Sequence, residues 1–307
     1  MGRTLTVTDD DNKTTTFTYA ATGEIATTVD ALNNTTRNDW DARGLLTSVT
    51  LPDPDGTGPL FSPVTEYGYD NVGQQTTVTD PFDRVTTYAY NNRGWVTSVT
   101  QPDPDGAGSA SAPVTTFGYD DTGRRTTVTD PLSRVTTTAY DDVGRVLTIT
   151  HPDPDGAGSL TSPVETYVYD DVGNVTSYTD PDGDVTTTAY DTIYRRTTLT
   201  EPDPDGAGPL TSAVTTWAYN SRGLLDKVTD AEGVETTFGY NGAGHRTSVT
   251  DDDGNVTTYV VDAHGNDLSV TLPDPDGVGP IESPYTSYGY NLRGDVVSIT
   301  SPENGMT

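Results

Sequence analysis

The chain consists almost entirely of tandem repeats, and this periodicity limits its fold more than any other feature of the sequence. Twelve units of 21 or 29 residues follow one another from residue 9 to residue 300. Two short units come first, four pairs of a long and a short unit fill residues 51–250, and one short and one long unit end the series. In such arrays each repeat contacts its neighbours, so we expect repetition itself to stabilise the fold.

Each unit has the pattern of one β-hairpin. In the unit 130–150, two β-branched segments, Val135 to Tyr140 and Val146 to Thr150, are separated by a four-residue turn rich in Asp and Gly. This arrangement is typical of a hairpin. We therefore predict strands at about 83–90 and 95–100, with equivalents in every unit, and inserted loops that leave the same edge at every second hairpin.

Composition alone points to a different class of protein. Leu, Ile, Val and Phe together make up less than a fifth of the chain, and its formal net charge is −30. Few aliphatic residues combined with a high net charge are typical of disordered chains. The sequence also contains 18 Tyr, 3 Trp and many Thr residues, however, and these residue types favour strands.

Aromatic and aliphatic residues recur at fixed places in the two strands. An aromatic residue two positions before the last Tyr shares its face of the strand, because side chains alternate with period two. In the return strand, the fifth residue after the turn Gly is β-branched or apolar in eleven units and Thr28 in the other. We predict that these side chains stack between neighbouring hairpins as a core, each cross-strand pair contributing up to ~1 kcal/mol. The aromatic pairs are Tyr88/Tyr90, Phe117/Tyr119, Tyr167/Tyr169, Trp217/Tyr219, Phe238/Tyr240 and Tyr288/Tyr290.

A Tyr-Asp or Tyr-Asn pair precedes the turn, with Gly four residues after the Tyr. It occurs at Tyr69, Tyr90, Tyr119, Tyr140, Tyr169, Tyr190, Tyr219, Tyr240 and Tyr290, although Tyr194 replaces the turn Gly in one of these units. The motif resembles the YD-repeat (Rhs-repeat) family, and the resemblance covers essentially the whole chain. Three units alter the dipeptide, at Tyr19-Ala20, Trp40-Asp41 and Val261-Asp262. Because a bulky residue is unfavourable at positive φ, we expect the turn at Tyr194 to be wider or strained.

The resemblance implies an all-β fold of tandem β-hairpin repeats in a curled or spiral antiparallel sheet. In bacterial Rhs proteins, insecticidal toxin complexes and teneurins, such hairpins wind into a hollow shell. About 24 strands spaced ~4.8 Å apart would otherwise form an open sheet wider than usual, so curling is also expected physically. We predict a single array over 1–307, with twelve complete units over 9–300 and half-units at 1–8 and 301–307.

The long units each insert a Pro-Asp-Pro-Asp-Gly segment that is a candidate calcium site. Calcium prefers clustered oxygen ligands on loops that contain Gly. No later acidic residue completes the twelve-residue EF-hand pattern, so the alternative is a solvated turn stiffened by Pro. The candidate ligands are Asp53, Asp55, Asp103, Asp105, Asp153, Asp155, Asp203, Asp205, Asp274 and Asp276.

No sequence motif nominates a catalytic centre. The chain has no cysteine, no Gly-x-Ser-x-Gly, no phosphate-binding Gly-Lys-Ser/Thr and no His-Glu-x-x-His. His151 fills a slot that varies among the long units, so we expect it to be exposed. His245 and His264 flank consecutive turns, where they are either solvated turn residues or a metal-binding pair. We therefore predict no enzyme activity and no cofactor, with calcium at the Asp loops as the alternative.

Charge and resemblance together suggest the partners. The net charge of −30 argues against nucleic acid, and no apolar run approaches the roughly 20 residues that a membrane span needs. The resemblance implies a non-catalytic extracellular or cell-surface scaffold in a shell, stalk or fibre. The alternatives are a module that binds a neutral glycan or calcium, and the encapsulating segment of a toxin whose C-terminal part is missing. The half-units at both ends predict pairing with flanking repeats or with further copies, head to tail.

Overall fold

The computed structural model describes residues 3–56, 58–106, 108, 110–156, 158–206, 208–277, 279 and 281–301. These residues form 25 β-strands and contain no helix, which confirms the all-β prediction. The described part of the chain accordingly has no helix suited by length and hydrophobicity to crossing a bilayer. Residues 302–307 of the predicted C-terminal half-unit lie outside the described residues.

The chain divides into two compact units, Met1–Pro163 and Val164–Thr307. The first contains β1 (Thr6–Thr8), β2 (Thr14–Tyr19), β3 (Ile25–Val29), β4 (Thr35–Trp40), β5 (Leu46–Thr50), β6 (Val64–Tyr69), β7 (Gln75–Thr79), β8 (Val85–Tyr90), β9 (Val96–Thr100), β10 (Val114–Tyr119), β11 (Arg125–Thr129), β12 (Val135–Tyr140) and β13 (Val146–Thr150). The second contains β14 (Val164–Tyr169), β15 (Val175–Thr179), β16 (Val185–Tyr190), β17 (Arg196–Thr200), β18 (Val214–Tyr219), β19 (Leu225–Thr229), β20 (Glu235–Tyr240), β21 (Arg246–Thr250), β22 (Val256–Val261), β23 (Asp267–Thr271), β24 (Tyr285–Tyr290) and β25 (Val296–Thr300). The prediction of one array over 1–307 stays a prediction.

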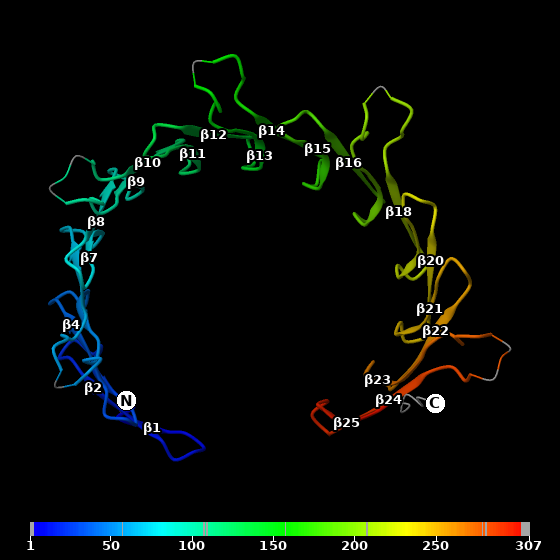
Figure 1. Cartoon of the computed structure of the whole chain (residues 1–307), viewed down its shortest axis with the longest axis horizontal. Coiled ribbons are helices and arrows are strands. Elements are labelled where there is room, and N and C mark those ends of the chain that lie inside the picture. Colours follow the sequence, from blue (N-terminus) through cyan, green and yellow to red (C-terminus); the bar gives the residue numbers. More distant parts are fainter. Residues whose placement is uncertain are drawn as a thin grey trace. The chain divides into compact units, whose positions relative to one another are not determined.

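Within each unit, every strand pairs antiparallel with its neighbours in the sequence (Figure 1). Strands β8 and β9 confirm the predicted positions of a hairpin's two strands. The ladder inside a hairpin runs from Thr137↔Thr150 to Tyr140↔Val146, with a bulge between Ala139 and Tyr140. The ladder between hairpins is shorter, since β11 and β12 pair only from Thr127↔Thr137 to Thr129↔Val135. Neighbouring hairpins are therefore joined by their backbones over only part of their length.

The two kinds of connection lie at opposite edges of the sheet. The four-residue turns within hairpins, such as 141–144, form one edge, which we call the turn edge. The connections between hairpins form the other, which we call the loop edge. The described residues of the long insertions, within 51–63, 101–113, 151–163, 201–213 and 272–284, lie there, as predicted, and Figure 1 shows them projecting from the ribbon.

The strands are staggered from one hairpin to the next. A row of paired residues runs from Ser98 through Thr116 and Thr129 to Val135, where it reaches the loop edge. The row thus advances by two residues for each hairpin, or about one residue per strand. A stagger of this size goes with strand tilts of roughly 35–45° in curved sheets. Stagger and strand twist together curl the sheet within each unit.

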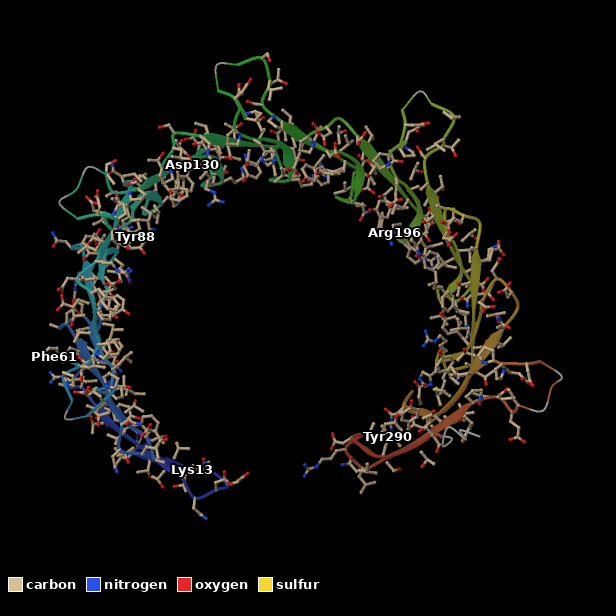
Figure 2. The ribbon with its side chains drawn as sticks, viewed as in Figure 1. Lys13, Phe61, Tyr88, Asp130, Arg196 and Tyr290 are labelled. Carbon is tan, nitrogen blue, oxygen red and sulfur yellow. The ribbon has the colours of Figure 1, made fainter. Side chains whose placement is uncertain are left out.

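The sheet in each unit is a single layer with unequal faces. In β8, Thr86, Tyr88 and Tyr90 are half-buried, whereas Val85 and Ala89 on the opposite face are exposed. We call the half-buried side the aromatic face. No apolar side chain in the described part of the chain is fully buried, and the polar Ser269 is the only buried residue there. The prediction of a core was therefore wrong in degree: the aromatic rings pack within one layer, and no second layer lies over them (Figure 2).

Candidate functional site

In nine hairpins the last Tyr of the outgoing strand bonds the return segment before it. Its hydroxyl donates to the backbone carbonyl two residues beyond the preceding turn Gly. Tyr90, for example, bonds the carbonyl of Gln75 at 2.8 Å and Tyr140 that of Arg125 at 3.0 Å. The same bond of 2.6–3.0 Å is made by Tyr19, Tyr69, Tyr119, Tyr190, Tyr219, Tyr240 and Tyr290. These bonds connect neighbouring hairpins close to the turn edge, where the backbone ladder between the hairpins has already ended. We call this boundary between two hairpins the seam.

We call this bond between the aromatic residue of one hairpin and the backbone of the hairpin before it the joint. Units that depart from the Tyr motif show which chemical groups the joint requires. Trp40 replaces Tyr, and its indole Nε1 donates to the carbonyl of Ile25 at 2.9 Å. The requirement is therefore an aromatic ring that carries a hydrogen-bond donor. Where Val261 stands in the Tyr position, the guanidinium of Arg246 lies 4.6 Å from the centroid of the Tyr259 ring instead. This contact has the geometry of a cation–π interaction.

The Asp or Asn after the Tyr closes the turn. The Oδ1 atom of Asp141 accepts the backbone N–H groups of Val143 and Arg145, at 3.0 and 2.9 Å. Asn91 accepts from Arg93 and Trp95 in the same way, so either side chain serves, because both present a carbonyl-type oxygen. Asp80 makes the equivalent bonds at the loop edge, where its hydrogen bond with the side chain of Arg84 lowers its pKa.

The turn Gly meets two requirements at once. Gly123 has φ +90°, and a Cβ placed on it would lie 2.6 Å from Cζ2 of Trp95, the residue that follows the previous turn Gly. The Trp95 ring also lies 5.4 Å from the Tyr119 ring, centroid to centroid. In most hairpins the residue after the turn Gly thus packs over the next turn, whereas no described residue lies against Gly294. The sequence pattern did not reveal this contact, because the partner lies a whole unit away.

Tyr194 keeps the turn geometry in spite of its size. Its N–H bonds the carbonyl of Asp191 at 3.0 Å, and its φ is +66°. The turn is therefore not wider, and the strain predicted for it is confirmed by the left-handed backbone. Asn174, which in other units would pack over a turn Gly, bonds its own turn residue Asp170. Asn174 is thereby held at its own turn by this bond to Asp170.

The candidate calcium ligands lie in the long loops, where they accept bonds from their own backbone. Asp53 Oδ1 accepts the N–H groups of Asp55 and Gly56, and Asp55 Oδ2 accepts that of Leu60 at 3.2 Å. The hydrogen bonds from the N–H groups of Asp55 and Leu60 recur in the four equivalent loops, which contain Asp103, Asp105, Asp153, Asp155, Asp203, Asp205, Asp274 and Asp276. Among the described residues, no group of three or more acidic or His side chains is placed to hold a metal ion. These bonds favour the turn alternative, and calcium stays a prediction.

The histidines occupy three different environments. His151 is half-buried, so the prediction that it is exposed was wrong, although the residues in its slot in the other long units, Leu51, Gln101, Glu201 and Leu272, are exposed. The His245 ring lies against Gly265 of the next turn, 3.2 Å from the position of a Cβ there. The imidazole of His264 is 88% exposed, with Nδ1 3.8 Å from Asp262 Oδ2. The sequence prediction of solvated turn residues agrees with the exposure of His264, and a metal pair formed by His245 and His264 stays an untested alternative.

Shallow clefts separate consecutive turns on the aromatic face. One is lined by Arg93, Trp95, Phe117 and Tyr119, and a similar one by Gln74, Tyr88 and Tyr90. They arise because the ladder between hairpins stops before the turn edge, which leaves the rings to line the seam. Only six acidic residues lie within strands, so most of the negative charge lies along the two edges. The faces offer mainly hydroxyl and aromatic groups, with Arg side chains over some of the rings.

The sequence matches one protein-family model, described as RHS Repeat, over residues 63–106, 119–156, 169–207 and 219–256. These four segments cover just over half of the chain. The first matched segment begins just before β6, and the other three begin at the last Tyr of an outgoing strand. The first three end in the next long loop, and the fourth ends at the first residue of β22. None of the curated proteins matches the sequence.

Several solved structures are similar to the chain. The crystal structure of TcdB2-TccC3 is 15% identical over 96% of this chain and 18% of its own, with a TM-score of 0.49. The Tc holotoxin pore of Photorhabdus luminescens is 15% identical over 95% of this chain and 18% of its own, with a TM-score of 0.47. A porin-like protein from Bacteroides uniformis is 15% identical over 80% of this chain and 92% of its own, with a TM-score of 0.26. The chain thus spans about a fifth of the length of the toxin chains it matches.

Proposed function

The chain belongs to the RHS-repeat family, and from this premise we propose that it is a non-catalytic structural scaffold, a wall segment of an extracellular shell, stalk or fibre. The observation that carries the proposal is the repeated joint, in which Tyr or Trp of one hairpin bonds the backbone of the hairpin before it. Each joint repeats the one before it, so the array is extended by adding hairpins without new contacts. Recurrence of the joint along the chain explains the Tyr, the Asp and the Gly of the motif without any catalytic role.

The proposed partner is a further RHS repeat at the exposed edge of β25. Every residue of β25 is exposed, and Ile299 has 64% of its surface accessible, whereas its equivalent Val128 in β11 is half-buried beside β12. An unpaired strand edge presents free N–H and C=O groups to another strand. In most internal hairpins, the carbonyl two residues after the turn Gly accepts a hydrogen bond from the Tyr hydroxyl of the next hairpin. The carbonyl of Val296 is the equivalent group in β25. An added outgoing strand ending in Tyr would complete this joint.

Strand direction decides how a second copy could provide this partner. Strands β1 and β25 are both return strands, so in the same orientation they would pair parallel, against the pattern of the sheet. The strand added at β25 must therefore be an outgoing strand. Such a strand comes either from flanking repeats of the same chain or from another copy, head to tail.

The scaffold proposal is tested by shortening the array. Deleting residues 101–150 joins Thr100 to His151, which occupies the position of Gln101, so the register of the repeat is kept. We expect the shortened chain to keep its strand content per residue by circular dichroism and to unfold cooperatively. Loss of the folded state would contradict the proposal, because it would show that the removed hairpins make contacts that the other hairpins cannot replace. Labelling of intact cells with an impermeant reagent tests the extracellular location.

The partner proposal is tested at β25. Light scattering at rising concentration, with and without the double change Val297→Lys and Ile299→Lys, measures growth through this edge. Lysine on an edge strand opposes strand addition. If the particles grow with concentration and the lysines abolish the growth, the partner is a second copy of the chain. If the chain is a monomer at all concentrations, the proposed partner is a flanking repeat. Growth that the lysines do not affect contradicts the assignment of this edge.

A further inference from the structure

One hairpin departs from all others at two positions, and the two departures meet. The second residue of the outgoing strand is Thr in eleven hairpins and Glu165 in the hairpin β14–β15. The fifth residue after the turn Gly is aliphatic or Thr in eleven hairpins and Tyr178 in this one. Glu165 and Tyr178 both lie on the aromatic face, beside Tyr167.

The three side chains form one hydrogen-bonded cluster. Tyr167 and Tyr178 are directly opposite each other in the ladder, with ring centroids 5.0 Å apart and an interplanar angle of 45°. Both hydroxyls donate to Oε2 of Glu165, Tyr167 at 2.7 Å and Tyr178 at 3.3 Å. The hydrogen bond to Glu165, together with burial and the carboxylate charge, raises the pKa of Tyr167 to about 12.

This arrangement suits loss of an electron from the phenols. A phenol resists oxidation when its proton has no acceptor, because the radical cation that would form is strongly acidic. A carboxylate bonded to the hydroxyl takes the proton as the electron leaves, in the manner of a general base. The other hairpins of the described chain place an aliphatic residue, Thr or Asn in one or both of these cross-strand positions, so a tyrosyl radical there has no phenol opposite it.

We propose that Tyr167 and Tyr178 are a modification site at which a one-electron oxidant of the haem-peroxidase class forms a dityrosine cross-link between β14 and β15. Two oxidising equivalents remove one electron from each phenol. The proton of Tyr167 passes to Glu165 and then to solvent, and the proton of Tyr178 leaves by the same carboxylate. The two radicals form one carbon–carbon bond between the ring carbons next to the oxygens. The hydrogens on those carbons move to the oxygens, so the product has lost two protons and two electrons in all.

The cross-link would tie the two strands of one hairpin covalently. This hairpin begins the second compact unit, Val164–Thr307. The bond joins facing residues and needs no change of register, because the rings already lie opposite each other. The site is independent of the scaffold proposal, since it depends on a single hairpin and not on the joints between hairpins.

The test uses the full chain and a photo-oxidised ruthenium polypyridyl complex with persulfate as the one-electron oxidant. Digestion before Asp170 and Asp171 separates Tyr167 from Tyr178, so a cross-linked pair of peptides, lighter by two hydrogens than their sum, identifies the product by mass spectrometry. We expect this pair to be the main dityrosine product. Its absence from the folded, oxidised chain overturns the proposal.

Matched variants separate chemistry from folding. Glu165→Thr restores the residue of the other eleven hairpins and should lower the yield about a hundredfold, the low end of what a positioned proton acceptor contributes. Tyr178→Val should abolish the product while circular dichroism stays that of the wild type. The transplant Thr86→Glu with Val99→Tyr should create a second cross-link, to Tyr88 in β8–β9. An unchanged yield in Glu165→Thr, or no new product in the transplant, overturns the role given to the carboxylate.

Discussion

Replacing Tyr140 tests the joint between hairpins most directly, because this residue combines the three contacts that a joint can make. Its ring is half-buried, its hydroxyl donates to the carbonyl of Arg125 at 3.0 Å, and the guanidinium of Arg124 lies 5.0 Å from the ring centroid. Tyr140→Phe removes the hydrogen bond alone. Tyr140→Ala removes all three contacts. Tyr140→Trp keeps a donor on an aromatic ring, as Trp40 does naturally.

The magnitudes follow from these contacts. A hydrogen bond of this kind contributes ~1 kcal/mol to the free energy of unfolding. A cation–π contact at an exposed site adds ~0.5–1 kcal/mol. A half-buried aromatic ring removes roughly 100 Å² from water, which at ~25 cal/mol per Å² is an upper estimate of ~2.5 kcal/mol. We therefore expect a loss of about 1 kcal/mol for Tyr140→Phe, about 2–4 kcal/mol for Tyr140→Ala, and under ~1 kcal/mol for Tyr140→Trp.

Urea unfolding followed by circular dichroism measures these differences. The control is Val143→Ala in the adjoining turn, where the Val side chain is 77% exposed and a change within ~0.5 kcal/mol is expected. Hydrogen exchange adds a local measure, since opening of the joint should deprotect amides in β11 and β12 before those of distant hairpins. If Tyr140→Phe and Tyr140→Ala unfold at the same urea concentration as Val143→Ala, the joint contributes no stability and the account of the Tyr motif is wrong.

Three further predictions concern pH, one turn and calcium. Burial raises the pKa of Tyr69 and Tyr90, so their contribution to stability is complete below pH ~10 and is lost as the pH rises through the folded-state pKa. Melting temperatures measured across this pH range should therefore fall. A melting temperature that does not change with pH would contradict the role of these hydroxyl groups as donors. Tyr194→Gly should stabilise the chain by roughly 0.5–1 kcal/mol in urea unfolding because it relieves φ +66°, whereas destabilisation would mean that the Tyr ring makes contacts that outweigh the strain. Melting curves with calcium and with chelator, at matched ionic strength, should coincide, since the loop carboxylates already accept backbone bonds; a rise with calcium that Asp103→Asn with Asp105→Asn removes would establish the ion site instead.

Hairpin positions and turn chemistry could be predicted from the sequence because both are local. The strands of β8 and β9 lie within a few residues of one turn, and period-two alternation places Tyr88 and Tyr90 on one face in any such strand. The Asp or Asn after the Tyr bonds backbone groups only two and four residues away, so its role follows from the turn itself. The resemblance drawn from the same motif is confirmed by the match to the RHS-repeat family.

The candidate sites were less predictable because their side chains have more than one local explanation. Asp53 and Asp55 are compatible with an ion site or with a turn, and only the positions of the nearby N–H groups distinguish these uses. His151 occupies a variable slot, yet it is half-buried, because variability among repeats does not measure burial. The cluster of Glu165 with Tyr167 and Tyr178 had a visible signal, the loss of a Thr that the other hairpins share, but its meaning depended on which residues the ladder placed opposite each other.

The sequence by itself determined the number of hairpins, their strand positions and the chemistry of their turns, because these depend on residues within one unit. The tertiary structure decided how hairpins are joined. The acceptor of the Tyr hydroxyl lies 15 residues back when the preceding connection is short and 23 back when it is long, as for Tyr90 and Tyr69. Both distances lead to the same atom of the repeat only because the stagger between hairpins is constant, and that stagger is set by the ladder between them. A pattern with period two shows which side chains share a face, but not whether another layer covers that face, and here the described rings remain half-buried in a single sheet.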